Sequence, residues 1–206
     1  MKTVHRILFV LVTLSLLAGC GGLSRKAVEK RYYTLDVQRE RAEAAPVSEK
    51  LLKVRRMQIS PLYDGRELVY KLDNGRMESD FYNLFFMPPV ELLSHDLDRW
   101  MDGAGLFAGS VSPASLAEAD YTLEGVVNVL YGDFSGGRES ALVEMQFFLI
   151  DERSAENHIV FSRNYSVRTP VSGNSPASVV QGMREGARAV FTSLESDLRT
   201  FLAGKL

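Results

Sequence analysis

The sequence predicts an α+β fold: a mainly antiparallel or mixed β-sheet with two amphipathic helices packed on one of its faces. Three long runs, over 121–131, 141–149 and 159–167, alternate between apolar and other residues, as half-buried strands do. Two other segments, 90–101 and 180–201, repeat apolar residues every three or four positions, which indicates amphipathic helices. Asn74-Gly75 lies between two further strand-like runs and predicts a β-hairpin, because both turn positions need a positive φ.

The first 19 residues are organised like a secretory signal peptide. Lys2 and Arg6 precede the apolar run 7–18, and small residues follow it. As a helix, these 12 residues would span roughly 18 Å against about 30 Å of hydrocarbon, which disfavours a permanent transmembrane helix. We therefore expect a signal peptide over 1–19, a lipidated tether over 20–30 and a single α+β periplasmic domain over 31–206.

Cys20 is the single cysteine of the chain and ends the motif Leu17-Ala18-Gly19-Cys20. The motif resembles the bacterial lipobox, in which the cysteine thiol is acylated and the signal is then cleaved in front of it. The resemblance implies that Cys20 becomes the lipid-bearing first residue, with palmitate among its acyl chains. Gly21 is not the aspartate that retains lipoproteins in the inner membrane, which implies outer-membrane sorting with the domain facing the periplasm. A free or disulfide-bonded cysteine is the alternative.

Composition narrows the class of protein. The formal net charge is −2, and without Lys2 and Arg6 the chain carries 22 basic against 26 acidic residues, which does not indicate a nucleic-acid partner. A domain of this length buries a sizeable core without disulfides. We expect no cofactor and no metal, because the sequence has neither a cluster of cysteines and histidines nor a phosphate-binding glycine loop.

In the first half of the domain, the aromatic and β-branched run 31–37 predicts a strand, and the charged segment 38–50 predicts an exposed, mobile connection. The imperfectly alternating run 51–60 predicts a second strand that ends at Pro61. The hairpin strands are expected over 67–73 and 76–86.

In the second half, Pro88-Pro89 opens a helix that ends at Gly103 and Gly105, and a short strand follows over 106–111. The three alternating runs are joined by short links, so they should pair antiparallel in order. Ser175-Pro176 opens the last helix, with serine as the N-cap. A coiled coil is the alternative for its apolar stripe. The same helix has a second line of small residues: Gly182, Gly186, Ala189 and Ser193. Another backbone could pack closely against this line, which leaves room for self-association.

Two serines imitate hydrolase motifs, but neither has the required spacing. Ser175 precedes Pro176, which has no backbone N–H to donate to an oxyanion. Ser135 lies in Gly132-Asp133-Phe134-Ser135-Gly136-Gly137, where an inserted phenylalanine breaks the serine-protease pattern and the glycines suit a hairpin loop. His95 and His158 are isolated along the domain, so we expect no catalytic residue.

The stretch 81–89 is the most aromatic of the chain. It packs in the core, or it forms an apolar patch that binds a partner. The candidates for partner binding are Tyr82, Phe85, Phe86, Pro88 and Pro89.

The order of these motifs resembles the ABC-type transport auxiliary lipoprotein family. The matching features are the lipobox, Tyr32-Tyr33-Thr34-Leu35, the strand end Ile59-Ser60-Pro61 with Tyr63 and Arg66 behind it, Leu68-Val69-Tyr70, and Tyr82 followed by Pro88-Pro89 before a helix. The resemblance implies a periplasm-facing lipoprotein that works with an ABC permease, its ATPase and an MCE-domain protein to move lipids between the two membranes.

We therefore expect a protein that acts by tethering and protein contact, not by catalysis. Two alternatives stay open: an envelope lipoprotein with serine hydrolase activity, and a structural envelope lipoprotein without a transport role.

Overall fold

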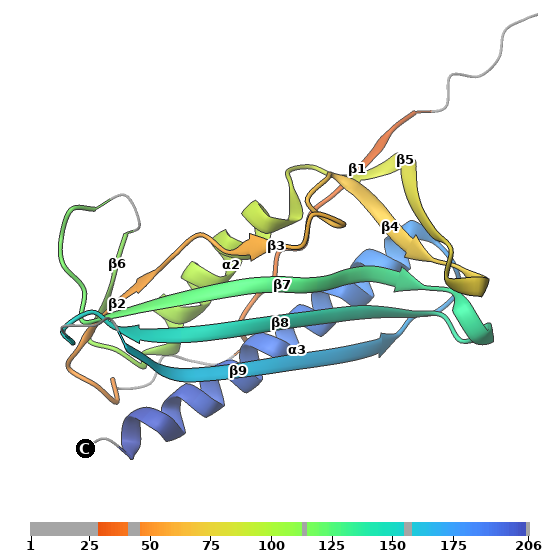
Figure 1. Cartoon of the computed structure of the whole chain (residues 1–206). Coiled ribbons are helices and arrows are strands. Elements are labelled where there is room, and N and C mark those ends of the chain that lie inside the picture. Colours follow the sequence, from red (N-terminus) through yellow and green to blue (C-terminus); the bar gives the residue numbers. More distant parts are fainter. Residues whose placement is uncertain (1–28, 41–45, 113–114, 155–157, 205–206) are drawn as a thin grey trace, which may run out of the picture.

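The computed structural model describes residues 29–40, 46–112, 115–154 and 158–204. Its described strands form one nine-stranded open sheet, and both described helices, α2 and α3, lie behind that sheet in Figure 1. The predicted α+β fold with two helices on one face is therefore confirmed. The signal peptide, Cys20 and most of the tether lie outside the described residues, so the three-part division of the chain stays a prediction.

The sheet is built around β7 (Tyr121–Asp133), which runs the length of the molecule. One side of β7 pairs antiparallel with β8 (Ser140–Asp151), which pairs in turn with β9 (His158–Pro170). This confirms the predicted meander.

The other side of β7 is covered in succession by three short parallel strands: β2 (Leu51–Val54), β3 (Gln58–Ile59) and β4 (Glu67–Lys71). Beyond β2 lies β6 (Gly109–Val111), also parallel. Beyond β4 lie β5 (Met77–Phe85), antiparallel, and then β1 (Arg31–Tyr33), parallel to β5. β1 therefore forms an edge of the sheet, at the end where the described chain begins (Figure 1).

The predicted hairpin is present, with Asn74 and Gly75 at φ 62° and 75° in the short helical turn η2 (Asp73–Gly75). The predicted strand over 51–60 is instead two strands. The reason is that the Met57 N–H donates to Ser94 Oγ of α2 at 2.9 Å, away from β7, and the Met57 side chain enters the core.

Both helices form where their apolar spacing predicts. α2 (Pro89–Ala104) ends at Gly105, whose left-handed φ of 57° suits glycine. α3 (Pro176–Ala203) begins after Ser175, whose hydroxyl accepts the Ser178 N–H at 3.1 Å. The helices meet where the Trp100 and Phe191 rings lie 5.6 Å apart, and Phe191 also reaches Phe147 of the sheet.

The glycines of α3 face the sheet, not a second molecule. A Cβ at Gly182 would lie 2.5 Å from Val171 Cγ1 and 2.9 Å from the Ala141 Cβ, and one at Gly186 would lie 2.9 Å from Val143 Cγ2. These glycines let α3 approach β8 and the end of β9 closely. The small-residue line therefore does not provide the surface for self-association that the sequence suggested, since only Ala189 and Ser193 are exposed.

The segment after β1 differs most from expectation. The predicted strand over 31–37 stops at Tyr33, and residues Leu35–Glu40, which we call the strap, cross both helices. Leu35 and Val37 are buried, so the end of the predicted strand is buried chain without strand pairing. Of the connection expected over 38–50, Gln38 and Glu40 are exposed, Arg39 is half-buried, and residues 41–45 lie outside the described residues.

Charged groups on the helices hold the strap in place. The Val37 N–H donates to the buried Asp96 carboxylate at 2.8 Å, and Arg39 forms two 2.9 Å bonds with the buried Glu195. Trp100 Nε1 donates to the same carboxylate at 3.0 Å. Burial would raise the pKa of Glu195, but the bonds from Arg39 and Trp100, with the charge of Arg199, outweigh it and hold the pKa below its usual value.

Candidate functional site: an aromatic ridge at the start of the domain

The aromatic stretch of the sequence forms a large bulge in β5. Glu67 of β4 lies opposite Leu84, but the next residue, Leu68, lies opposite Asp80. Residues 81–83 therefore have no partner in β4, and the strand bends outward over them. This bend turns Phe81 and Tyr82 to the surface, where the exposed fractions are 64% and 43%.

Asp80 stabilises the bulge from within. Its Oδ1 accepts the backbone N–H groups of Tyr82 and Asn83 at 2.9 and 3.0 Å, and its Oδ2 accepts Asn83 Nδ2 at 2.8 Å and the Tyr70 hydroxyl at 3.1 Å. Burial favours the neutral acid, but these four bonds outweigh it and lower the pKa of Asp80. Burial and the nearby Asp80 charge raise the pKa of Tyr70, so its hydroxyl stays a donor.

We call the exposed apolar residues of β1, β5 and the two residues after β5 the aromatic ridge: Tyr32, Phe81, Tyr82, Phe86 and Met87. The Tyr32 and Phe86 rings lie edge to face at 6.4 Å, and those of Phe81 and Tyr82 at 5.1 Å. Two cations cover the rings, with Lys30 Nζ 4.2 Å from the Phe81 centroid and the Arg66 guanidinium 5.3 Å from that of Tyr32. The ridge is therefore apolar with a basic margin.

The structure divides the five predicted partner-binding residues into two groups. Tyr82 and Phe86 lie on the ridge, and Pro88, half-buried, precedes α2. Phe85 and Pro89 lie in the core, so they are not available to a partner. Partner binding by the remaining three stays a prediction.

Sequence reasoning did not include Tyr32, Lys30 or Arg66 in this surface. Tyr32 joins it only because β1 pairs with β5 across a separation of about 50 residues, with Tyr32 opposite Leu84. Arg66 is held there by a 3.0 Å bond from its Nε to the Phe85 carbonyl. No local pattern of the sequence indicates either contact.

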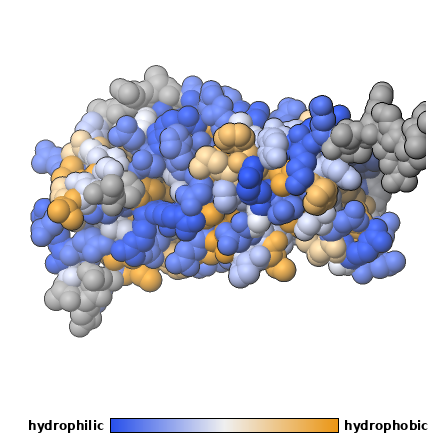
Figure 2. All heavy atoms as spheres, turned by 90° about the horizontal axis from the view of Figure 1, so that it is seen from above, coloured by the Kyte–Doolittle hydropathy of each residue, from blue (hydrophilic) through white to orange (hydrophobic). Residues whose placement is uncertain are grey.

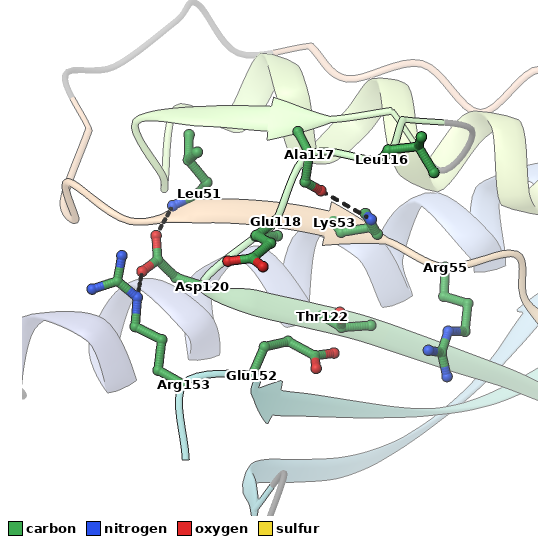
Figure 3. A pocket seen from close by; sticks show the side chains of 11 residues that line it. Leu51, Lys53, Arg55, Leu116, Ala117, Glu118, Asp120, Thr122, Glu152 and Arg153 are labelled. Atoms are coloured by element: carbon green, nitrogen blue, oxygen red, sulfur yellow. Dashed lines mark hydrogen bonds and ion pairs between the residues drawn. The ribbon is translucent and has the colours of Figure 1, made fainter. Parts of the chain in front are cut away.

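A different surface lies at the other end of the long strands. Between β2, the segment 116–120 and the residues after β8 is an open recess of about 660 Å³. Figure 3 shows charged side chains around it, among them Lys53, Arg55, Glu118 and Glu152. Asp120 accepts the Leu51 N–H at 2.8 Å and forms an ion pair with Arg153. This recess is charged, in contrast to the ridge.

The two serines of the hydrolase hypothesis have structural contacts. Ser175 caps α3, as predicted. The Ser135 hydroxyl and backbone N–H both donate to Asp133 Oδ1, and Asp133 Oδ2 accepts Arg168 Nη1 at 2.7 Å. These bonds give both hydroxyls a structural role, Ser175 in capping a helix and Ser135 in closing a loop.

Two further observations concern only the described residues. They contain no group of three or more His, Cys, Asp or Glu side chains arranged to hold a metal ion. Within the same part of the chain, neither helix combines the length and the apolar character needed to cross a membrane.

Comparison with solved structures supports the fold. The chain is similar to protein XCC0632 from Xanthomonas campestris, with a TM-score of 0.65 and 21% identity over 80% of this chain and 94% of that one. It is also similar to the hypothetical protein CT253 from Chlamydia trachomatis, with a TM-score of 0.55 and 8% identity over 76% of this chain and 99% of that one. At these identities the likeness concerns the fold alone.

No curated protein matches the sequence. The family model described as the ABC-type transport auxiliary lipoprotein component matches residues 33–194, from the end of β1 to the last third of α3. This match includes the strap, the bulge of β5 and both glycines of α3, and it ends one residue before Glu195. It therefore extends over nearly all of the described domain. The chain therefore belongs to the ABC-type transport auxiliary lipoprotein family.

Proposed function

We propose that the protein is the anchored auxiliary component of an ABC/MCE-type system that moves lipids between the inner and outer membranes. In this proposal Cys20 carries the lipid, the anchor lies in the outer membrane, and the domain faces the periplasm. Its partners are an MCE-domain protein and the ABC permease with its ATPase. The observation that carries the proposal is the family match over 33–194.

The described domain supports a role in tethering and contact. Five of its ten exposed large apolar side chains lie at the ridge, near the start of the described domain, and charged side chains line the recess at the far end. Tyr82 and Phe86, with Pro88 beside them, keep the exposure that a contact surface needs. Self-association, if it occurs, would use a face other than the glycines of α3, because the sheet occupies them.

The anchor is tested by replacing Cys20 with alanine in cells that express the full-length chain. We expect the parent to incorporate an alkyne-labelled palmitate and to fractionate with the outer membrane. Cys20→Ala should lose the label and accumulate unprocessed or in the periplasm. Equal labelling and fractionation of the two proteins would refute the anchor, and recovery of the acylated parent with the inner membrane would refute the sorting.

The transport role is tested by crosslinking cells that express the tagged chain and identifying the proteins that co-purify. We expect an MCE-domain protein and an ABC permease or ATPase. Tagged Cys20→Ala, expressed at the same level, is the matched control and should recover fewer of them. Recovery of envelope structural proteins without any transport component would favour the structural alternative.

A further inference from the structure

The aromatic ridge lies at the place where the chain leads toward the anchor. Glu29 is the first described residue, Lys30 contacts the Phe81 ring, and β1 begins at Arg31. If Cys20 is lipidated, as proposed above, the nine peptide units from Cys20 to Glu29 reach at most about 32 Å even when fully extended. The ridge therefore cannot move far from the membrane that holds the anchor.

The exposed apolar residues are concentrated, not scattered. Ten large apolar side chains of the described domain are exposed, and five of them form the ridge. The view from above shows apolar side chains as small patches among hydrophilic residues (Figure 2). Single exposed apolar residues are normal on a protein surface, but the ridge has two exposed ring pairs on or beside paired strands, Tyr32 with Phe86 and Phe81 with Tyr82, and such groups mark contact sites.

The composition of the ridge fits the interface between lipid and water. Tyrosine and phenylalanine rings enter the region between headgroups and acyl chains, and methionine adds a flexible apolar side chain. Lys30 and Arg66 lie at the rings, where their charged ends can reach lipid phosphates while their stems stay on apolar surface. Among the acids of this region, Asp80 has both carboxylate oxygens occupied by bonds within the bulge and with Tyr70. Glu29 and Glu67 are the chain neighbours of Lys30 and Arg66, so the margin of the ridge carries both signs of charge and, of these described residues, only the two cations contact the rings.

The opposite end of the domain has the chemistry of a surface that stays in water. β7 has 13 residues, which at about 3.3 Å per residue separate its two ends by roughly 40 Å. At the far end lies the charged recess around Asp120. Leu51 and Leu116 are exposed among these charges. The far end therefore combines charged groups with two exposed apolar side chains, whereas five lie near the tether.

We propose that the aromatic ridge is a membrane-contacting surface. Tyr32, Phe81, Tyr82, Phe86 and Met87 enter the headgroup layer of the bilayer that holds Cys20, and Lys30 and Arg66 bind its phosphates. The contact is a second attachment beside the lipid, and it fixes the orientation of the domain. The long strands then point away from the membrane and present the charged recess to the periplasm.

The experiment places a tryptophan at the ridge and another at the far end. The described core lies between Leu35 and Leu202, so the chain from Cys20 onward retains all of it. This chain is coupled through its single thiol to a maleimide lipid, in vesicles of phosphatidylethanolamine with a minority of phosphatidylglycerol. Some of the lipids carry bromine near the headgroup, which quenches nearby tryptophan. Phe86→Trp reports on the ridge and Leu116→Trp on the far end, while buried Trp100 gives a constant background.

We expect at least twofold quenching of Phe86→Trp and none of Leu116→Trp, after subtraction of the parent signal. In a second measurement, the uncoupled chain with Cys20→Ser should bind the vesicles about tenfold less tightly once Tyr82→Ser and Phe86→Ser are added, equivalent to about 1.4 kcal/mol. Equal quenching at both positions would overturn the proposal. So would a Phe86→Trp signal that responds only when the MCE-domain partner is added, because the ridge would then bind protein.

Coupling through a maleimide lipid does not depend on acylation in cells. If the palmitate experiment fails, the proposed anchor is wrong while the vesicle result still decides whether the ridge contacts lipid.

Discussion

Replacing Gly182 with alanine should destabilise the protein, although alanine is the better helix former. In the interior of α3 the substitution gains about 1 kcal/mol of helix propensity. Against this, the new Cβ would lie 2.5 Å from Val171 Cγ1 and 2.9 Å from the Ala141 Cβ. Overpacking of a core costs about 1–3 kcal/mol, and the upper half of that range applies because Ala141 has no rotamer to change. We expect a net loss of about 1–2 kcal/mol.

The assay is urea unfolding of the chain from residue 20 onward, with Cys20→Ser in every sample to exclude thiol chemistry. Gly103→Ala, near the end of α2, is the matched control, because nothing lies within 4 Å of its new Cβ. This control should be as stable as the parent or more stable by up to about 1 kcal/mol. If Gly182→Ala unfolded at the parent's urea concentration or above it, the close packing of α3 on the sheet would be refuted.

Three further predictions use the same assay. Glu195→Gln should lower the free energy of unfolding by about 3 kcal/mol, because it leaves the Arg39 charge without its buried carboxylate. The control Glu91→Gln, in the exposed pair with Arg56, should lower it by less than about 1 kcal/mol. The pKa of Glu195 in the folded protein lies below the unfolded value of 4.5, so the ionised carboxylate stabilises the fold above that pH, and this stabilisation is lost as the pH falls. The free energy of unfolding should therefore decrease more steeply below pH 4.5 for the parent than for Glu195→Gln. Phe85→Ala should cost about 3–5 kcal/mol and Phe86→Ala about 0.5 kcal/mol or less, since only the first ring is buried. Ser175→Ala should cost about 1 kcal/mol through loss of the N-cap.

Each of these comparisons has a result that contradicts its reasoning. Equal costs for Glu195→Gln and Glu91→Gln would show that the strap contact contributes no more than a surface pair. Parallel pH curves for Glu195→Gln and the parent would exclude Glu195 as the source of the acid sensitivity. A large loss of stability in Phe86→Ala would show that this ring packs in the core and not on the ridge. A Ser175→Ala variant as stable as the parent would show that the capping bond does not stabilise α3.

The elements that the sequence predicted are those with local signals. The stripe of α3, its serine cap, the Asn74-Gly75 turn and the meander of β7, β8 and β9 are each specified by residues close together in the chain. Alternation along β5 also implies that Phe85 and Phe86 point to opposite faces, but it does not say which face is covered. The structure places Phe85 inside because that face of the sheet meets the helices.

The features that the sequence did not predict depend on distant residues. Arg39 and Glu195 are separated by 156 positions, and nothing near either one indicates an ion pair. The parallel pairing of β2, β3 and β4 with β7 likewise joins segments that are far apart in the chain. The bulge of β5 depends on Asp80, which replaces ladder bonds with side-chain bonds that no alternation pattern reveals.

Under the proposal that Cys20 anchors the chain, the strap has a mechanical consequence. Any pull on the tether reaches β1 first, and its parallel pairing with β5 is short, covering only three residues. The load then passes to Leu35–Glu40, where buried apolar side chains and the bonds from Arg39 to Glu195 join it to both helices. β1 can therefore peel from β5 while the strap stays joined to both helices, so the pull stops at the strap and does not unravel the helical layer.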